Sequence, residues 1–358
     1  PASRMGRPCE NRQAVVQSVQ RNHYDTDKTM QAIKPDPQAP FFIVLNACSG
    51  SSETELRRSV IEEVLTGAGR RFELALVDDP GNLAAIAACT AAKASAADGI
   101  LVAAGGDGTI NAVAREAVVQ GCLFGVLPQG TFNYFGRTHH IPEDLGDAVR
   151  ALLDAQVQPV QVGVVNDRIF LVNASIGLYP RLLEERELDK KQFGRSRFVA
   201  FLSGLKTFFS PHRRLRITRD LDGKERTLRT STLFVGNNRL QMEQVGIAPL
   251  SDALEDGKLA AIAPKSVGKL GMLGLMLRAM LGRLGEAENL VTFSFRRMTV
   301  RPRKFYGKRR VKVATDGEVT QMDTPLEFRV LEGQLLLLKP AAAEPARAAP
   351  DTAVRKIA

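Results

Sequence analysis

The chain has 358 residues, of which 44% are hydrophobic and 25% charged, and its formal net charge is +10 at pH 7. This length and composition are typical of a soluble globular protein with two domains, and the longest apolar stretch, residues 270–281, is too short to cross a bilayer. The four cysteines form no CxxC pair, which argues against a disulfide-rich or zinc scaffold and fits a reducing cytoplasm. The positive charge suits an anionic partner: a nucleotide, an anionic membrane surface or nucleic acid.

Both ends of the chain have the composition of flexible segments. Residues 1–40 are polar and end in KPDPQAP, which is typical of a linker. From Pro340 onward, the sequence PAAAEPARAAPDTAVRKIA is typical of a flexible tail. We therefore predict a flexible leader over residues 1–40 and a disordered tail over residues 339–358.

Between Phe41 and Gln158, apolar strands alternate with helical patterns. Short apolar runs predict strands at residues 41–45, 72–77, 100–104 and 123–127. Helical spacing covers residues 53–65 and 83–97, and apolar residues from Ile110 to Val118 lie on one face of a further helix. This alternation predicts an α/β domain over residues 41–158, in which helices cover a parallel sheet.

After Gln158 the pattern changes to short strands separated by turn residues. They are predicted at residues 160–165, 169–174, 215–218, 230–235, 259–262, 291–295, 298–300 and 311–314. Helical insertions are predicted around residues 181–209 and 267–284. We expect a mostly antiparallel, β-rich second domain over residues 159–338, whose last strand, residues 335–338, can join either domain.

The strand at residues 100–104 leads into GGDGT, where three glycines and an aspartate precede a helix. The glycines let a ligand approach the backbone, and the helix N-terminus beyond them suits phosphate. Asp107 would repel phosphate, so it makes sense there if it holds a hydrated metal ion or meets a hydroxyl. The alternative is a tight strand-to-helix turn in which Asp107 is a cap.

Two further polar, glycine-containing loops follow predicted strands. NACSG, residues 46–50, ends the first strand, and LPQGTFN, residues 127–133, ends the strand after GGDGT. Because the carboxyl ends of parallel strands meet at one edge of a sheet, the three loops predict a phosphate-binding cleft. Neither GxxxxGK[ST] nor GxGxxG is present, so this cleft is neither a P-loop nor a dinucleotide site.

These motifs resemble those of the diacylglycerol kinase catalytic domain family, which includes bacterial soluble diacylglycerol kinases and sphingosine kinases. GGDGTIN is similar to its nucleotide-loop signature, NACSG to NPxSG, and LPQGTFNYFGR to LPxGTxNDFAR. VNASIGLYP, VGNN, DALEDGKL and TDGE follow in the family's order, so the resemblance runs from Phe41 to Leu338.

The resemblance implies a fold, an activity and a place of action. The fold is an NAD kinase/diacylglycerol kinase-like α/β nucleotide domain followed by a β-rich lipid domain, with the active site between them. The activity is magnesium-dependent transfer of the γ-phosphate of ATP to a lipid hydroxyl of diacylglycerol or a sphingoid lipid, in phospholipid metabolism. We expect a cytoplasmic enzyme that is peripheral to the inner face of the membrane. Whether it forms a homodimer is left open.

The resemblance also assigns the site residues. Glu318 of TDGE is implied as the general base, with Asp316 and Asp107 as further catalytic carboxylates. A structural magnesium bound by some members is implied at Asp256, with the backbone oxygens of Ala253 and Lys258. The residues expected around ATP are Asn46, Ser49, Gly50, Gly105, Gly106, Gly108, Thr109, Asn111, Gly130, Thr131 and Asn133. The alternative for Asp316-Gly317-Glu318 is a β-hairpin turn, which Asp-Gly favours.

Two other functions stay open, and one of them follows from a departure from the family pattern. Tyr134 stands where the family's GTxND has an aspartate, which puts the identity of the acceptor in question. A protein that binds lipid or nucleotide without catalysis is therefore one alternative. An NAD kinase-like enzyme is the other, because GGDGT also occurs in that family.

Two surface features have alternatives of their own. The basic residues between Arg301 and Lys312, around Phe305-Tyr306, form either an exposed hairpin or a contact for anionic lipid headgroups. No nucleic-acid module accompanies them, so nucleic acid is not expected as a partner. The apolar face of residues 270–281 either packs on the β-rich domain or forms the lip of a lipid cleft.

Overall fold

The computed structural model of the chain describes residues 34–48, 51–177, 180, 215–221, 224–230, 232–265, 269–302 and 310–341. The helical insertion expected at residues 181–209 lies outside the described residues. So do most of the expected leader, most of the expected tail, and the centre of the basic segment between Arg301 and Lys312. Among the described residues, no helix has the length and apolar character that crossing a membrane demands.

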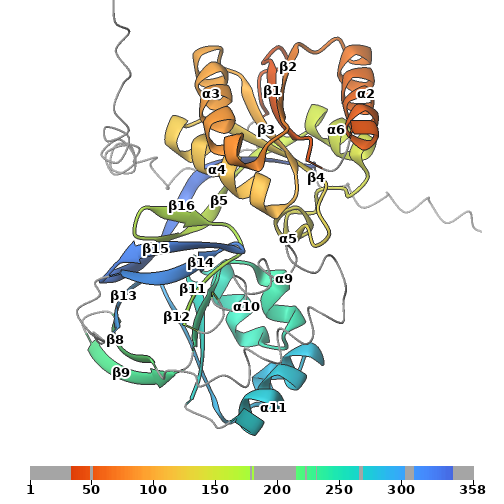
Figure 1. Cartoon of the computed structure of the whole chain (residues 1–358). Helices are drawn as coiled ribbons and strands as arrows, with labels where there is room; N and C mark the ends of the chain where they lie inside the picture. The colour runs from red at the N-terminus through yellow and green to blue at the C-terminus, as the bar shows by residue number, and fades with distance from the viewer. Residues whose placement is uncertain are drawn as a thin grey trace, which may run out of the picture.

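The first part of the chain is a parallel sheet covered by helices, which confirms the predicted α/β architecture. Its strands run in the order β2 (Phe72–Val77), β1 (Phe41–Asn46), β3 (Ile100–Gly105) and β4 (Leu123–Pro128). Helices α3 (Leu83–Ala96) and α4 (Asp107–Gln120) lie on one face, while α2 (Ser51–Gly67) and α6 (Leu145–Leu153) lie on the other (Figure 1). Because both faces are covered, every residue of β3 is buried, as expected for an apolar central strand.

The residues just before β1 are attached to this sheet. The backbone oxygen of Pro40 accepts a hydrogen bond from the N–H of Ile100 at 2.9 Å, and Ala39 is buried. The carboxylate of Asp36 accepts from the N–H of Gln38 at 2.8 Å. The composition of these residues predicted a flexible leader. In the structure they instead pack at the end of the first sheet where β1 and β3 begin.

A long strand, β16 (Leu326–Lys339), connects the two parts of the molecule. Its residues Leu336 and Leu337 pair with β4 in parallel, and most of its length pairs antiparallel with β5 (Gln156–Val165). Its first residues pair with β13 (Arg297–Pro302). The residues 335–338, which the sequence could place in either part, therefore belong to a strand that both parts share.

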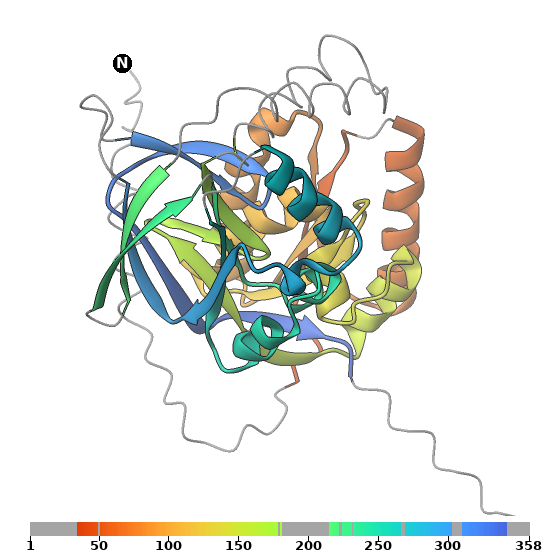
Figure 2. The same cartoon turned by 90° about the horizontal axis from the view of Figure 1, so that it is seen from below.

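The second part is β-rich and antiparallel, as the sequence predicted. A six-stranded sheet has the order β12 (Leu290–Phe295), β11 (Leu259–Pro264), β10 (Thr232–Gly236), β7 (Asn173–Gly177), β14 (Arg310–Thr315) and β15 (Glu318–Asp323). The strands β6 (Arg168–Phe170), β8 (Leu215–Leu221) and β9 (Lys224–Thr230) extend the sheet that contains β16. Buried side chains from both sheets, including Val235, Phe295 and Phe328, form one apolar cluster. Figure 2 shows the green and blue strands of this second part beside the orange and yellow helices of the first part.

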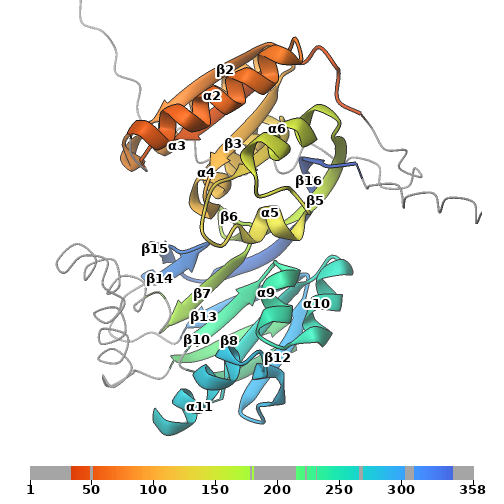
Figure 3. The same ribbon diagram turned by 90° about the vertical axis from the view of Figure 1, so that its right-hand side faces the viewer.

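Short helices flank this second part. Helices α9 (Arg239–Gln244) and α10 (Ala248–Glu255) lie beside the six-stranded sheet, whereas α11 (Lys269–Met280) lies at the end remote from α2 (Figure 3). The short 3₁₀ turns are Pro80–Asn82, before α3, and Leu284–Glu286, after α11. Leu275 of α11 is buried, but Leu277 is 52% exposed and Leu281, just after the helix, is 71% exposed. The predicted apolar face is thus only partly covered.

The contact between β5 and β6 supplies a test of the core. Gly163 of β5 pairs with Phe170 of β6, and a Cβ at position 163 would lie 2.3 Å from the Phe170 ring. Because Phe170 is fully buried, Gly163→Ala overpacks the core, and the free energy of unfolding should fall by about 1–3 kcal/mol in urea denaturation. Gly67→Ala at the end of α2 is the control, since a Cβ there meets nothing within 4 Å. Equal losses in the two variants would contradict this account.

Candidate active site

The three glycine-containing loops lie at one edge of the first sheet. Strands β1, β3 and β4 are neighbours, and Gly105 at the end of β3 pairs with Pro128 at the end of β4. Asn46 ends β1 beside them. This register brings together the loops as the strand-end argument predicted. Ser49 and Gly50, expected near ATP, lie outside the described residues.

Direct contacts hold these loops against one another. Asn46 Nδ2 donates to Thr109 Oγ1 at 3.0 Å, and the N–H of Gln129 donates to the oxygen of Gly105 at 2.9 Å. A Cβ on Gly130 would lie 2.9 Å from the Cα of Gly106, so the close approach of the two loops requires glycine. Several residues expected around ATP therefore shape the site through contacts within the protein.

Open space remains beside two of the expected nucleotide residues. A Cβ on Gly108 would meet no atom within 4 Å, and Gly108 and Thr131 are exposed. Gly108 is the second residue of α4, whose first N–H groups have no partner within the helix. This end of α4 is the part of the loop cluster that a phosphate can approach.

Asn133 and Tyr134 shape the start of α5 (Tyr134–Thr138). Asn133 is buried with a φ of +47°, and its Oδ1 accepts from the N–H of Gly130 at 2.7 Å. The ring of Tyr134 stacks on that of Phe132 with 5.7 Å between centroids. Asn133 thus closes a tight turn with its side chain, and Tyr134 turns its ring toward an exposed neighbour.

Asp107 lies in α4, but its carboxylate caps the start of the neighbouring helix α5. It is the first residue of α4, and one oxygen of its half-buried carboxylate lies 3.5 Å from the N–H of Phe135 in α5. Burial raises the pKa of Asp107, while the amides of Phe135, Tyr134 and Asn133 act in the opposite direction. The carboxylate therefore attaches the third loop to GGDGT.

Asp316 joins the two parts of the molecule. Its carboxylate accepts from Asn111 Nδ2 at 2.6 Å and from the N–H groups of Leu171, Val172 and Asn173 at 2.7–2.9 Å. Burial raises the pKa of Asp316 to about 6, against the effect of these four donors. A carboxylate offers about four acceptor positions, so all of those on Asp316 are occupied. Its geometry assigns it a positioning role.

Glu318 presents a carboxylate that remains accessible. It begins β15, its side chain is 69% exposed, and Oε2 lies 3.3 Å from a guanidinium nitrogen of Arg168. The Asp316-Gly317 turn directly before it has the positive φ values of a hairpin turn. The turn alternative and the acidic motif are therefore compatible, because the turn holds Asp316 inward and leaves Glu318 outward.

Two residues that contact the candidate site were not identified from their positions in the sequence. Arg168 lies in the short strand β6 and belongs to no motif, so nothing local indicates that it reaches Glu318. Asn238 lies in VGNN, and its Nδ2 donates to the oxygen of Tyr134 at 3.2 Å and to Thr138 Oγ1 at 2.8 Å. Its Oδ1 also accepts from the N–H of Gln241, so Asn238 connects α5 to α9.

The residues expected to hold a structural metal lie together at the end of α10. Their oxygens have partners within the protein: Ala253 O accepts from the N–H of Lys258 at 3.2 Å, and Asp256 Oδ2 lies 3.2 Å from Lys258 Nζ. Lys258 O accepts from Gln161 Nε2 at 3.1 Å. In the part of the chain that the structure describes, no three His, Cys, Asp or Glu side chains are grouped as for a metal ion.

Comparison with known proteins points to one family. Residues 40–165 match the family model described as "Diacylglycerol kinase catalytic domain". A segment of 80 residues is 40% identical to a protein named "Diacylglycerol kinase" from Staphylococcus epidermidis, covering 22% of this chain and 25% of that protein. A segment of 142 residues is 31% identical to a "Probable lipid kinase YegS-like" from Cronobacter sakazakii, covering 38% and 45%. The matches thus span less than half of these relatives.

The similarity in three dimensions is more extensive. The crystal structure of a putative diacylglycerol kinase from Bacillus anthracis str. Sterne superposes with a TM-score of 0.63. It covers 84% of this chain and 97% of that chain at 18% sequence identity. At this identity the comparison establishes the shared fold, including the β-rich second part beyond residue 165.

Asp316 and Glu318 should differ sharply when each carboxylate is replaced by an amide. In Asp316→Asn, an NH₂ group facing the N–H of Leu171 leaves a donor unsatisfied, so the free energy of unfolding should fall by about 1–3 kcal/mol. Glu318→Gln is exposed and should leave it unchanged. Urea denaturation at pH 7.5 measures both variants. A stable Asp316→Asn protein would show that the four hydrogen bonds do not hold the two parts together.

Proposed function

We propose, from the premise that residues 40–165 belong to the diacylglycerol kinase catalytic domain family, that this chain transfers the γ-phosphate of ATP to a lipid hydroxyl. The acceptor is of the diacylglycerol or sphingoid type. The observation that carries the proposal is the hydrogen bond between Asn111 and Asp316. It joins the helix that follows the glycine loop to the turn that presents Glu318, so nucleotide and base belong to one site.

The first turn of α4 is the proposed position of the ATP phosphates. Free N–H groups and the helix dipole favour anions there, and the exposed Gly108 leaves room for them. Magnesium fits this donor set, because in kinases it is held by one or two carboxylates together with phosphates and water, and Asp107 is the candidate. When bound, it neutralises phosphate charge during transfer.

Glu318 is the proposed general base. As the lipid hydroxyl oxygen forms its bond to the γ-phosphorus, the bond from phosphorus to the ADP oxygen breaks, and the hydroxyl proton passes to the Glu318 carboxylate. Arg168, 3.3 Å away, orients that carboxylate. Asp316 contributes by fixing the turn, since its own oxygens are occupied by four donors.

Access to a lipid acceptor is proposed through peripheral contact with a membrane. Leu277 and Leu281 present apolar surface at α11, at the end of the molecule remote from α2 (Figure 3). The net charge of +10 favours an anionic lipid surface. Together these features support docking of the β-rich part onto a bilayer, in which the substrate resides.

The catalytic proposal predicts a large loss of turnover in Glu318→Gln. General base catalysis contributes about 100- to 10,000-fold, so transfer of label from ATP to lipid should fall by at least the lower figure. The assay contains magnesium and a panel of diacylglycerol, sphingoid base, ceramide and phosphatidylglycerol. Asp323→Asn, at the exposed far end of β15, is the control and should retain activity.

Three outcomes would contradict the catalytic proposal. No labelled lipid from folded wild-type protein would exclude the activity under the tested acceptors, and formation of NADP from NAD would favour the alternative nucleotide kinase. Near-normal turnover by Glu318→Gln with the true acceptor would exclude Glu318 as the base.

The membrane proposal predicts that Leu277→Ser combined with Leu281→Ser lowers activity on vesicles several-fold. It should leave activity on dispersed short-chain lipid unchanged, because the catalytic residues are intact. Leu56→Ser, at a 65% exposed leucine of α2, is the matched control and should behave as wild type in both assays. Equal losses in the two assays would indicate damage to the fold or site instead of lost docking.

A further inference from the structure

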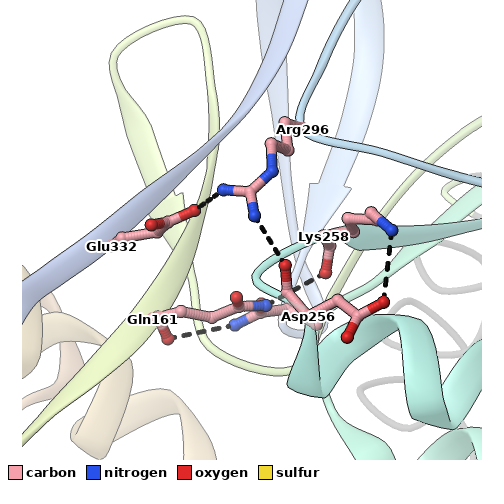
Figure 4. Close-up of polar contacts among 6 residues, drawn as sticks. Gln161, Asp256, Lys258, Arg296 and Glu332 are labelled. Atoms are coloured by element: carbon pink, nitrogen blue, oxygen red, sulfur yellow. Dashed lines mark hydrogen bonds and ion pairs between the residues drawn. The ribbon is translucent and has the colours of Figure 1, made fainter.

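A polar cluster joins the turn after α10 to the strand shared by the two parts of the molecule. Arg296, between β12 and β13, donates through one amino group to the carboxylate of Glu332 in β16 and through the other to the backbone oxygen of Asp256 at 2.7 Å. Figure 4 shows this guanidinium between the two oxygens. Lys258 lies on the other side of Asp256, with Nζ 3.2 Å from Oδ2.

Gln161 of β5 completes the cluster from below the turn. Its Nε2 donates to the oxygen of Lys258 at 3.1 Å (Figure 4). The same Nε2 donates to Asn237 Oδ1 at 2.7 Å. The turn approaches β16 so closely that a Cβ on Gly257, whose φ is +68°, would lie 2.8 Å from Glu332 Oε1. Donors from β5 (Gln161), from the residue between β12 and β13 (Arg296) and from the turn itself (Lys258) therefore converge on its oxygens.

These contacts do not suit the structural divalent ion that the family resemblance implies at Asp256. The Asp256 carboxylate already pairs with an ammonium, and a guanidinium occupies its backbone oxygen. A hard divalent cation takes several oxygen ligands and gains most from carboxylates that no other cation neutralises. Here it would meet the ammonium of Lys258 and the guanidinium of Arg296, both bonded to Asp256, and these positive charges repel it.

We infer that Arg296 and Lys258 take the place of a structural metal ion, so that the turn after α10 is held to β5 and β16 by internal cations. A divalent ion would bridge oxygens of the turn, whereas the Arg296 guanidinium bridges the turn to Glu332 on another strand. The flanking helices α9 and α10 are thereby fastened to the strands that continue into the first sheet. This inference concerns stability and goes beyond the proposed kinase reaction.

The first test measures the melting temperature of the nucleotide-free, full-length protein in EDTA, in MgCl₂ and in CaCl₂. The expected result is the same melting temperature in all three, because no divalent ion binds the turn. A saturable rise with either metal in the wild type that is lost in Asp256→Asn would overturn the inference. A rise that persists in Asp256→Asn belongs to another site and leaves the turn free of metal. Kinase activity does not enter this readout, so the two proposals fail independently.

The second test compares two adjacent arginines. Arg296→Met should lower the melting temperature by about 2–4 °C, and EDTA should not change the shift. Arg297→Met is the matched control: Arg297 is 70% exposed and its contact with Glu327 is 3.4 Å long, so its loss should have a smaller effect. Equal shifts in the two variants would show that the Arg296 contacts do not secure the turn.

Discussion

The arrangement of the candidate site depends on one buried carboxylate. Asp316 receives four hydrogen bonds, three from consecutive backbone amides after β6 and one from Asn111 on α4. Without an acceptor at that place, the three amides that follow β6 would lose this partner, each at a cost of about 1–3 kcal/mol. Because α4 begins at the glycine loop and Asp316 begins the turn to Glu318, the same contact relates the phosphate-binding end of one sheet to the carboxylate of the other.

The two parts of the molecule are joined both by backbone pairing and by hydrogen bonds of polar side chains. β16 pairs with β4 of the first sheet, with β5, and with β13 of the second part, which gives a continuous hydrogen-bonded path between them. Such pairing fixes how the two parts are oriented relative to each other, but it does not fix the distance between the loops that face each other at the candidate site. That distance is set by Asn238, which connects α5 to α9, and by Asp316. The contact between the two parts is therefore polar at the site, whereas buried leucines of the shared strand, such as Leu335 and Leu337, pack into the core of the first part.

The sequence was sufficient for the architecture and for the meeting of the three loops, because apolar runs identify parallel strands and parallel strands end at one edge. It did not distinguish ligand-binding side chains from those that shape the loops. Thr109, Asn111 and Asn133 are polar residues in the expected motifs, yet their side chains form hydrogen bonds with Asn46, Asp316 and Gly130. Arg168 could not be found at all, since its contact with Glu318 spans 150 residues of sequence without a local pattern.

The exchange of aspartate for Tyr134 has a physical consequence in this geometry. Position 134 begins α5, and the amides at that helix start face the Asp107 carboxylate. A second carboxylate there would compete for the same amides and repel Asp107. Tyr134 instead stacks on Phe132, so Asp107 faces the helix start without an acidic neighbour in the loop of residues 129–134. The carboxylates placed against the glycine loop and its helix are therefore Asp107, which faces the start of α5, and Asp316, which reaches Asn111 from the other part of the molecule.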